Sequence, residues 1–230
     1  VRGVEDLGGG LKASFNFEQG INGESGATDA ATFQRAANMA LSGGFGRFQM
    51  GRTLNPSFFG VAAWELTGTA NYSAVGNQFG YAGYSSYDAA GKKIVTDFAN
   101  GGHPRTNSVF QYTTPDLGGF SGTFGVTMKP DNVIPGGAQV AGVPVGNAKY
   151  DLNAIYRNGP LVAALSYNKT NGQSATGISY KGNMVLGASY DFGMVKVAGS
   201  IQNAGGPSKG FTLGATVPVG AFALTLDIAR

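Results

Sequence analysis

The chain lacks cysteine entirely and has a single histidine, His103, among its 230 residues. Without thiols it can form neither disulfide bonds nor thiolate metal sites, and one imidazole offers little to zinc or copper. The absence of thiols also fits export to an oxidising compartment, where free cysteines are a liability. Because a sole histidine leaves no partner set for a nucleophile and its base, we expect neither an enzyme nor a metal or cofactor site.

Charged residues are scarce as well. They make up 13% of the chain, about half of the roughly one quarter that soluble domains carry. The net charge of +3 is small and the basic residues form no runs, so nucleic acid is not an expected partner. No apolar stretch approaches the roughly 18 residues that a membrane helix needs. The mean hydropathy of -0.05, with 42% hydrophobic residues, instead fits a protein with one apolar and one polar surface.

Strand patterns with a period of two residues recur along most of the chain. In Leu11–Glu18 the odd positions are apolar and the even positions polar, which assigns each set to one face of a strand. Phe33–Ser42 and Phe45–Thr53 alternate poorly, and we interpret them as wall that packs against protein at an oligomer interface rather than as irregular edge strands. The other alternating segments are Phe120–Lys129, Ala148–Arg157, Asn183–Phe192, Val195–Gln202, Phe211–Val217 and Phe222–Ile228.

The connections between these segments are alternately short and long. Asn158–Pro160 is a tight turn, whereas Pro130–Asn147 is long and rich in glycine. Transmembrane β-barrels have short turns at one rim, long loops at the other, a polar lumen and strands of about 9–11 residues. A soluble β-sandwich also alternates, but its loops show no such rhythm. We therefore predict an all-β fold, a transmembrane antiparallel up-and-down β-barrel.

One long stretch, Thr53–Asn107, shows neither strand alternation nor a helical period. It contains the only tryptophan of the chain, Trp64, and a run of small, polar and aromatic residues. Long loops without regular structure are uncommon inside compact domains and are usually functional. We predict that this stretch folds into the bore of the barrel and narrows it.

Four segments carry a family resemblance in this order: Val4–Phe15, Leu41–Arg52, Asn107–Gly122 and Leu186–Gly193. Together they resemble the Gram-negative general porins, especially the β-proteobacterial branch. The resemblance implies homotrimers of sixteen-stranded barrels in the outer membrane, in contact with lipid and lipopolysaccharide. It also implies an inward third external loop, whose place Thr53–Asn107 occupies.

The same resemblance gives the domain organisation. Residues 1–230 would be one porin domain, with residues 53–107 as the constriction loop inside it. Since about twelve strands are visible in the sequence, we expect a segment that lacks the family's first strand and its last three. Val1 and Arg230 then lie inside strands, and the terminal phenylalanine of the family is absent.

A porin is a passive diffusion channel for ions and small hydrophilic solutes, and its selectivity comes from the bore width and the charges along it. By the resemblance, the basic cluster opposite the loop maps onto Arg2, Arg35 and Arg105. Guanidinium groups stay protonated and bind anions in a bidentate manner, so we predict mild anion selectivity. Strand parity supports Arg2 but conflicts with Arg35, which would share a face with Phe33 and Met39.

Further charged residues are predicted to line the bore or to lie on the loop. Arg47 and Arg52 are five residues apart and hence on opposite faces, with Arg47 toward the lumen and Arg52 at a subunit interface. A solute-specific porin for phosphate or a dicarboxylate, and a non-conducting adhesive barrel, remain the alternatives. The predicted lumen wall is Lys12, Glu18, Arg47, Lys149, Asp151 and Arg157, and the predicted loop charges are Glu65, Asp88, Lys92, Lys93 and Asp97.

Overall fold

The computed structural model describes residues 1–28, 32–70, 73–79, 86–87, 93–94, 105–128, 148–171, 182–203 and 209–230. The main element in these residues is a 12-stranded sheet, whose neighbouring strands follow the order of the sequence. Its strands are β1 (Arg2–Gly8), β2 (Leu11–Glu18), β3 (Ala36–Gly43), β4 (Gly46–Leu54), β7 (Arg105–Thr113), β8 (Phe120–Thr127), β9 (Lys149–Asn158), β10 (Leu161–Thr170), β11 (Asn183–Asp191), β12 (Lys196–Asn203), β13 (Lys209–Val219) and β14 (Phe222–Ala229).

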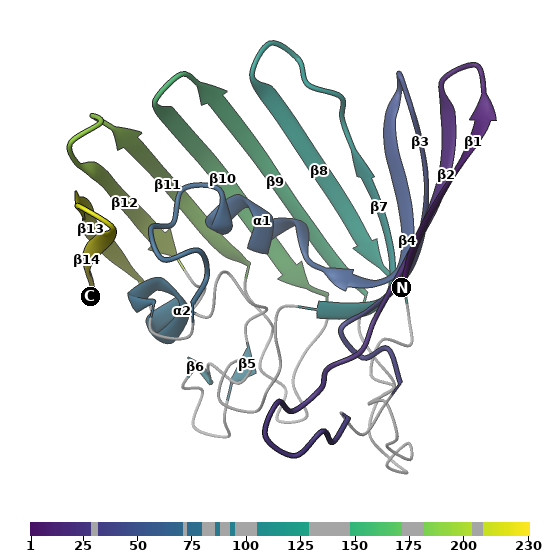
Figure 1. Ribbon diagram of the computed structural model, residues 1–230, viewed down its shortest axis with the longest axis horizontal. Helices are drawn as coiled ribbons and strands as arrows, with labels where there is room; N and C mark the ends of the chain where they lie inside the picture. The colour runs from purple at the N-terminus through teal and green to yellow at the C-terminus, as the bar shows by residue number, and fades with distance from the viewer. Residues whose placement is uncertain are drawn as a thin grey trace.

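The sheet bends into an open arc with β1 at one end and β14 at the other (Figure 1). Every neighbouring pair of strands in it is antiparallel. Among the described residues, β1 pairs only with β2 and β14 only with β13. The predictions of an all-β, up-and-down architecture and of about twelve strands are confirmed.

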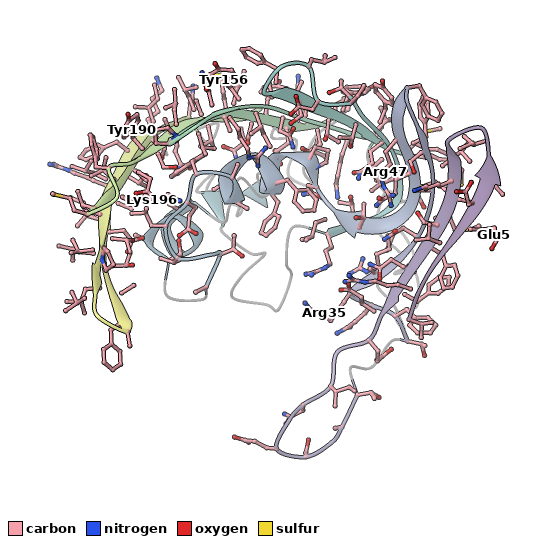
Figure 2. All side chains as sticks on the ribbon, turned by 45° about the horizontal axis from the view of Figure 1, so that its top comes forward. Glu5, Arg35, Arg47, Tyr156, Tyr190 and Lys196 are labelled. Atoms are coloured by element: carbon pink, nitrogen blue, oxygen red, sulfur yellow. The ribbon has the colours of Figure 1, made fainter. Side chains whose placement is uncertain are left out.

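The register sorts the side chains onto a concave inner face and a convex outer face. On the inner face, Asp151 pairs with Asn168, which pairs with Asn183. Figure 2 shows Arg47 and Lys196 on this concave side, and Glu5, Tyr156 and Tyr190 on the convex side. The outer face exposes large apolar side chains, among them Phe124, Tyr150, Met184, Leu186, Ile201, Leu213, Leu224 and Leu226. The alternation read from the sequence therefore separates a polar interior from an apolar exterior.

The two rims of the arc differ in their connections. Short turns join β1 to β2, β9 to β10 and β13 to β14 at one rim, and the longer connections leave from the opposite rim (Figure 1). The first turn runs through Gly8, Gly9 and Gly10, whose φ values of 84°, 60° and 81° fall in the left-handed region that favours glycine. This short and long rhythm is the one predicted from the sequence.

The segments that alternate poorly are strands with irregular ends. β3 begins at Ala36, three residues later than the predicted Phe33–Ser42, because Phe33 has a positive φ of 54° and leaves the extended conformation. β4 contains a register shift between Gly51 and Thr53, and Gly51 has a φ of 115°. A bulge of this kind disturbs the period-2 pattern of a strand, which explains the weak alternation in the sequence.

The connection between β4 and β7 folds back onto the inner face. It contains α1 (Pro56–Ala62), α2 (Ala74–Phe79) and a separate pair of short strands, β5 (Ser86–Tyr87) and β6 (Lys93–Ile94). The helices have seven and six residues, about two turns or fewer, which is too short to give a helical period in the sequence. Among the described residues, no helix is long and apolar enough to cross a membrane.

The buried apolar cluster lies between this connection and the inner face of the sheet. Val61, Trp64 and Val75 come from the connection, and they pack with side chains from β9 to β12. Figure 1 shows α1 crossing the concave side of the arc in front of β9 and β10. The strand residues of the cluster are Ile155, Ala164, Val185 and Ala198.

Candidate functional site

The start of α1 is fixed to the sheet by hydrogen bonds. The backbone N–H of Ser57 donates to Asp151 Oδ1 at 2.5 Å, and its hydroxyl donates to Asp151 Oδ2 at 2.9 Å. Asn153 Nδ2 donates to the carbonyl of Pro56 at 2.6 Å, and Ser166 Oγ donates to the carbonyl of Ser57 at 2.9 Å. Asp151 is only 2% exposed. It lies on the inner face as predicted, but the prediction that it lines the bore is wrong, because α1 covers it.

A second wall carboxylate holds α2. Asp227 Oδ2, on β14, accepts the backbone N–H of Ala74 at 2.8 Å. Each of the two short helices therefore has a carboxylate from the sheet at its first turn, where unpaired N–H groups and the helix dipole favour negative charge. Neither helix has an acidic residue of its own in that turn. The sheet thus supplies a carboxylate to each helix, and at α2 the hydroxyl of Ser73 also accepts the backbone N–H of Gly76 at 3.2 Å.

Trp64 fills a depression in the wall between the two helices. It is 2% exposed, and a Cβ at Gly187 would lie 2.1 Å from its ring. A Cβ at Gly60 would likewise lie 2.1 Å from Ser166 Oγ. Both contacts are too close for any side chain, so glycine at these two positions is what lets α1 and the indole approach the strands.

Glu65 is also a structural group. It is 6% exposed, and its carboxylate accepts hydrogen bonds from the hydroxyls of Thr67 and Ser73 and from the backbone N–H of Thr69, at 2.5, 2.9 and 2.9 Å. These bonds order the turn that leads from α1 toward α2. Glu65 lies within the stretch predicted as the loop, and its carboxylate is buried there.

The connection covers the inner face from β9 to β14 and leaves a cavity on its other side. This cavity has a volume of about 390 Å³ and lies between α1 and the inner face of β1 to β4. Its only contribution from α1 is Phe59. The other lining residues are Arg2, Gly3, Val4, Ser14, Phe15, Asn16, Asn38, Arg47, Gln49 and Thr53.

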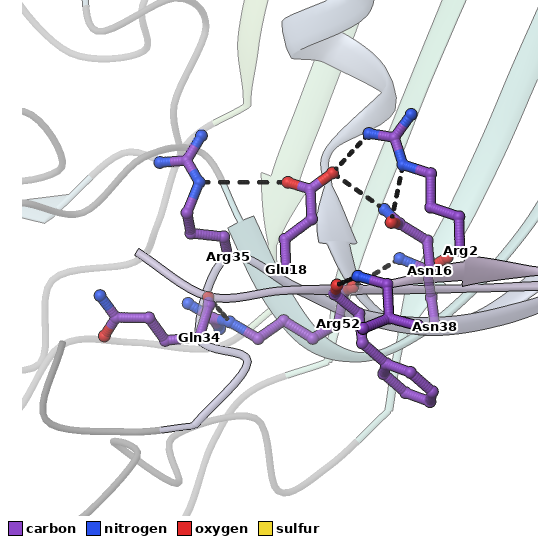
Figure 3. A network of polar contacts seen from close by, with 9 residues as sticks. Arg2, Asn16, Glu18, Gln34, Arg35, Asn38 and Arg52 are labelled. Atoms are coloured by element: carbon purple, nitrogen blue, oxygen red, sulfur yellow. Dashed lines mark hydrogen bonds and ion pairs between the residues drawn. The ribbon is translucent and has the colours of Figure 1, made fainter. Parts of the chain in front are cut away.

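Two arginines, Arg2 from the cavity lining and Arg35, approach the carboxylate of Glu18. Arg2 Nη2 lies 2.8 Å from Glu18 Oε1, and Arg2 Nε donates to Asn16 Oδ1 at 3.1 Å. Arg35 Nε approaches the other oxygen, Glu18 Oε2, at 4.0 Å. Figure 3 shows Arg2 and Arg35 on opposite sides of the Glu18 carboxylate. One carboxylate thus positions two guanidinium groups.

The parity conflict for Arg35 is resolved by the start of β3. Arg35 precedes the strand, and its backbone N–H donates to the carbonyl of Glu18 at 3.2 Å. Strand alternation therefore does not apply to it, and Figure 2 shows its side chain on the concave side of the arc. Arg105, at the start of β7, lies within electrostatic range of Arg35, Arg52 and Glu18. Its buried Nε and Nη1 have no hydrogen-bond partner among the described residues.

Arg52 takes a different place from Arg47. Arg47 lies on the inner face and lines the cavity, where its guanidinium donates to Gln49 Oε1 and Ser14 Oγ. Arg52 pairs with Ala37 in the register, on the opposite face. It donates to the carbonyl of Gln34 and to Asn107 Oδ1, the latter at 2.7 Å.

The remaining predicted residues are distributed along the inner face or beyond the described part. By the register, Lys12, Lys149 and Arg157 share the inner face, at different distances from the cavity. Lys93 belongs to β6, for which the structure describes the strand assignment and not the side chains. Asp88, Lys92 and Asp97 lie outside the described residues.

Sequence reasoning missed Phe59, Asn38 and Gln49 as cavity residues. Asn38 and Gln49 could have been found, because strand parity puts them on the same face as Arg47 or its register partner Ser42. Nothing in the local pattern singles out Phe59, since α1 is too short to show which side faces the sheet. Its position follows only from the way Ser57 and Gly60 dock.

A curved antiparallel sheet with an apolar exterior, a polar interior and an inward loop defines a membrane β-barrel wall of the porin class. The sequence matches the family model for Gram-negative porins over residues 1–230, and the chain belongs to that family.

Two curated relatives are similar to the chain. It is 33% identical to the outer membrane porin protein 32 of Delftia acidovorans, over 96% of this chain and 60% of that protein. It is 31% identical to an outer membrane porin protein of Bordetella pertussis, over 86% of this chain and 49% of that protein. The chain thus spans 60% or less of the length of these relatives.

Solved structures agree with this fold. The anion-selective porin from Comamonas acidovorans has a TM-score of 0.72 at 28% identity, over 99% of this chain and 66% of that one. A loop-deletion mutant of the outer membrane protein OmpT of Vibrio cholerae has a TM-score of 0.63 at 12% identity, over 97% of this chain and 69% of that one. The second likeness concerns the fold alone.

Proposed function

We propose that this chain forms the wall and the inward loop of a passive diffusion channel for ions and small hydrophilic solutes in the outer membrane of a Gram-negative bacterium. The observation that carries the proposal is the cavity of about 390 Å³ between α1 and the arginine-bearing face of β1 to β4. Its lining includes two arginines and several uncharged polar residues, beside Val4, Phe15 and Phe59, and the outer face of the same strands exposes apolar side chains. Such an arrangement suits a water-filled passage through lipid.

The channel is proposed to be mildly anion-selective. Arg2, Arg35 and Arg105 gather around one carboxylate, Glu18, and Arg47 adds a further positive charge on the same face. Fixed guanidinium charges in a narrow passage raise the local concentration of anions. The printed name of the Comamonas structure, an anion-selective porin, points the same way.

The stretch Thr53–Asn107 is proposed to be the constriction of a single porin domain over residues 1–230. Within it, α1 follows the end of β4 at Leu54, is bound to β9 and β10 and narrows the concave space in front of β1 to β4. The charges of Asp88, Lys92, Lys93 and Asp97 belong to the same proposal, as residues of the constriction loop.

The outer face is proposed to meet lipid, lipopolysaccharide and two further copies in a homotrimer. Exposed apolar residues of β3 and β4, such as Met39 and Phe48, fit contact with acyl chains or with a neighbouring subunit. We assign the chain no catalytic role, in line with a family of channels. Chemical cross-linking of the detergent-solubilised protein, expected to stop at three subunits, tests the assembly.

The function is tested by conductance of the full-length protein in a planar bilayer under a KCl gradient. Stepwise openings with a zero-current potential of anion sign are expected. A potential of cation sign would contradict the role of the arginines, but it would still support the channel function. A folded, heat-modifiable protein that passes no current would instead favour a non-conducting barrel.

A further inference from the structure

Phe59 is an aromatic side chain that faces the polar cavity. In α1, Ser57, Gly60 and Val61 are buried against the sheet, whereas Phe59 keeps 42% of its surface exposed and lines the cavity. Its ring packs edge-on against that of Phe58, with centroids 5.6 Å apart and planes at 78°. One side of the Phe59 ring therefore contacts Phe58, and another side is open toward the cavity.

The opposite wall of the cavity presents positive charge and amide groups, together with Val4 and Phe15. Arg47 is held by Gln49 Oε1 at 3.2 and 3.3 Å and by Ser14 Oγ at 3.3 Å, and Arg2 is held by Glu18 and Asn16. Arg2 and Arg47 are the charged groups among the described residues that line the cavity. A carboxylate that enters this space meets two guanidinium groups and no lining carboxylate.

The cavity therefore combines two recognition elements. Guanidinium groups bind carboxylates through paired charge-assisted hydrogen bonds. An exposed phenylalanine favours another aromatic ring in a stacked or edge-to-face arrangement, beyond the gain from burying apolar area. A volume of about 390 Å³ is at the lower end of small-molecule sites, which begin at about 300 Å³.

We infer that this cavity is a binding site for monocyclic aromatic carboxylates, and that Phe59 is the residue that distinguishes them from small aliphatic anions. The inference rests on the proposed channel function and deepens it. An inorganic anion or acetate engages only Arg2 and Arg47, so it gains nothing from the helix. An aryl carboxylate places its charge on the sheet side and its ring on α1.

The test is block of the chloride current through the full-length protein in a planar bilayer, with benzoate or acetate added. A favourable ring contact corresponds to a half-blocking concentration for benzoate about two- to tenfold lower than for acetate. Phe59→Ala is expected to remove this difference. Phe59→Leu keeps apolar bulk at the same position, and it should lower the benzoate preference while the protein folds normally.

Two variants serve as controls. Phe211→Ala removes a phenylalanine of similar exposure, 44%, from the outer face of β13 and is expected to leave the benzoate preference unchanged. Arg47→Gln is expected to weaken the block by both anions to the same extent. Equal block by benzoate and acetate in the wild type, or an unchanged preference in both Phe59 variants, overturns the inference. Absence of any current overturns the proposed function instead.

Discussion

The inner faces of β9–β14 and β1–β4 both carry polar side chains, but these side chains meet different surroundings. On β9–β14, Asp151, Ser166 and Asp227 are bonded to the inward connection, which buries Asp151 and Ser166 and leaves Asp227 half-buried. On β1–β4, the side chains line an open cavity and carry guanidinium groups. Polar residues on the inner face thus have two surroundings, since some hold the connection and others line a cavity.

The residue types on the two groups of strands explain why β9–β14 hold the connection and β1–β4 line the cavity. The strands β9–β14, called here the seating half, provide carboxylates next to the first residues of α1 and α2. They also have a glycine, Gly187, where Trp64 approaches. Helix N-termini attract carboxylates and repel cations. The arginines of the other half, Arg2 and Arg47, cannot cap a helix N-terminus, and α1 reaches that side only through Phe59.

The largest effect is expected from Trp64→Ala, which removes the anchor of the seating half. Loss of a buried tryptophan costs about 3–5 kcal/mol. We expect a lower unfolding temperature together with larger and noisier single-channel currents, because the connection no longer holds its place. Phe222→Ala, at the exposed start of β14, is the control and should change neither quantity appreciably. Unchanged currents in Trp64→Ala would show that the anchor does not set the bore.

Asp151→Ala tests the capping of α1 by the sheet. It leaves the N–H and hydroxyl of Ser57 without their acceptor, which costs about 1–3 kcal/mol for buried groups. The variant should unfold at lower temperature in heat-modifiability assays. Asp151→Asn keeps an acceptor oxygen and should recover part of the loss. If both variants unfold like the wild type, the buried carboxylate is not what seats the helix.

Gly187→Ala tests the close approach of the indole without deleting any group. The new Cβ would lie 2.1 Å from the Trp64 ring, and overpacking of this kind costs about 1–3 kcal/mol. Gly199→Ala on the neighbouring strand is the matched control, since its Cβ would find its nearest atom at 3.3 Å. Equal unfolding temperatures for the two variants would show that the close contact between Gly187 and Trp64 does not require glycine.

Arg2→Gln addresses the other half and should change stability least. Its ion pair with Glu18 is exposed, and such pairs contribute about 0–1 kcal/mol. We expect the unfolding temperature to stay close to that of the wild type while the anion-to-cation permeability ratio falls. Arg157→Gln, near the short-turn rim, should lower the ratio less. A drop in stability without a change in selectivity would reverse the roles assigned to the two halves.

The sheet was predictable from the sequence because each strand must separate an apolar exterior from a polar interior. Leu11–Glu18, for example, is β2 with the same bounds. For Arg35, parity conflicted with the position that the family resemblance implies, and parity misleads here because Phe33 interrupts the extended chain before β3 begins. Local periodicity cannot show where a strand starts when a residue of positive φ precedes it.

The seating half could not be predicted, because it depends on contacts between distant segments. Asp151 and Ser57 are 94 residues apart, and on its own strand Asp151 looks like any other hydrated wall residue. Glu65 likewise gives no local sign of the turn that buries it. The arginine-bearing half was more accessible, since Arg47 projects inward by parity alone and Arg2 also follows from the family resemblance.

Cysteine accessibility distinguishes a passage between α1 and β1–β4, as proposed, from a passage on the other side of α1. The chain has no cysteine, so Gln49→Cys on the cavity side and Ser166→Cys beneath α1 each add one thiol. A charged methanethiosulfonate reagent should reduce the open-channel current stepwise in Gln49→Cys and leave Ser166→Cys unaffected. Block of Ser166→Cys alone would contradict the account, because the passage would then lie on the seating side.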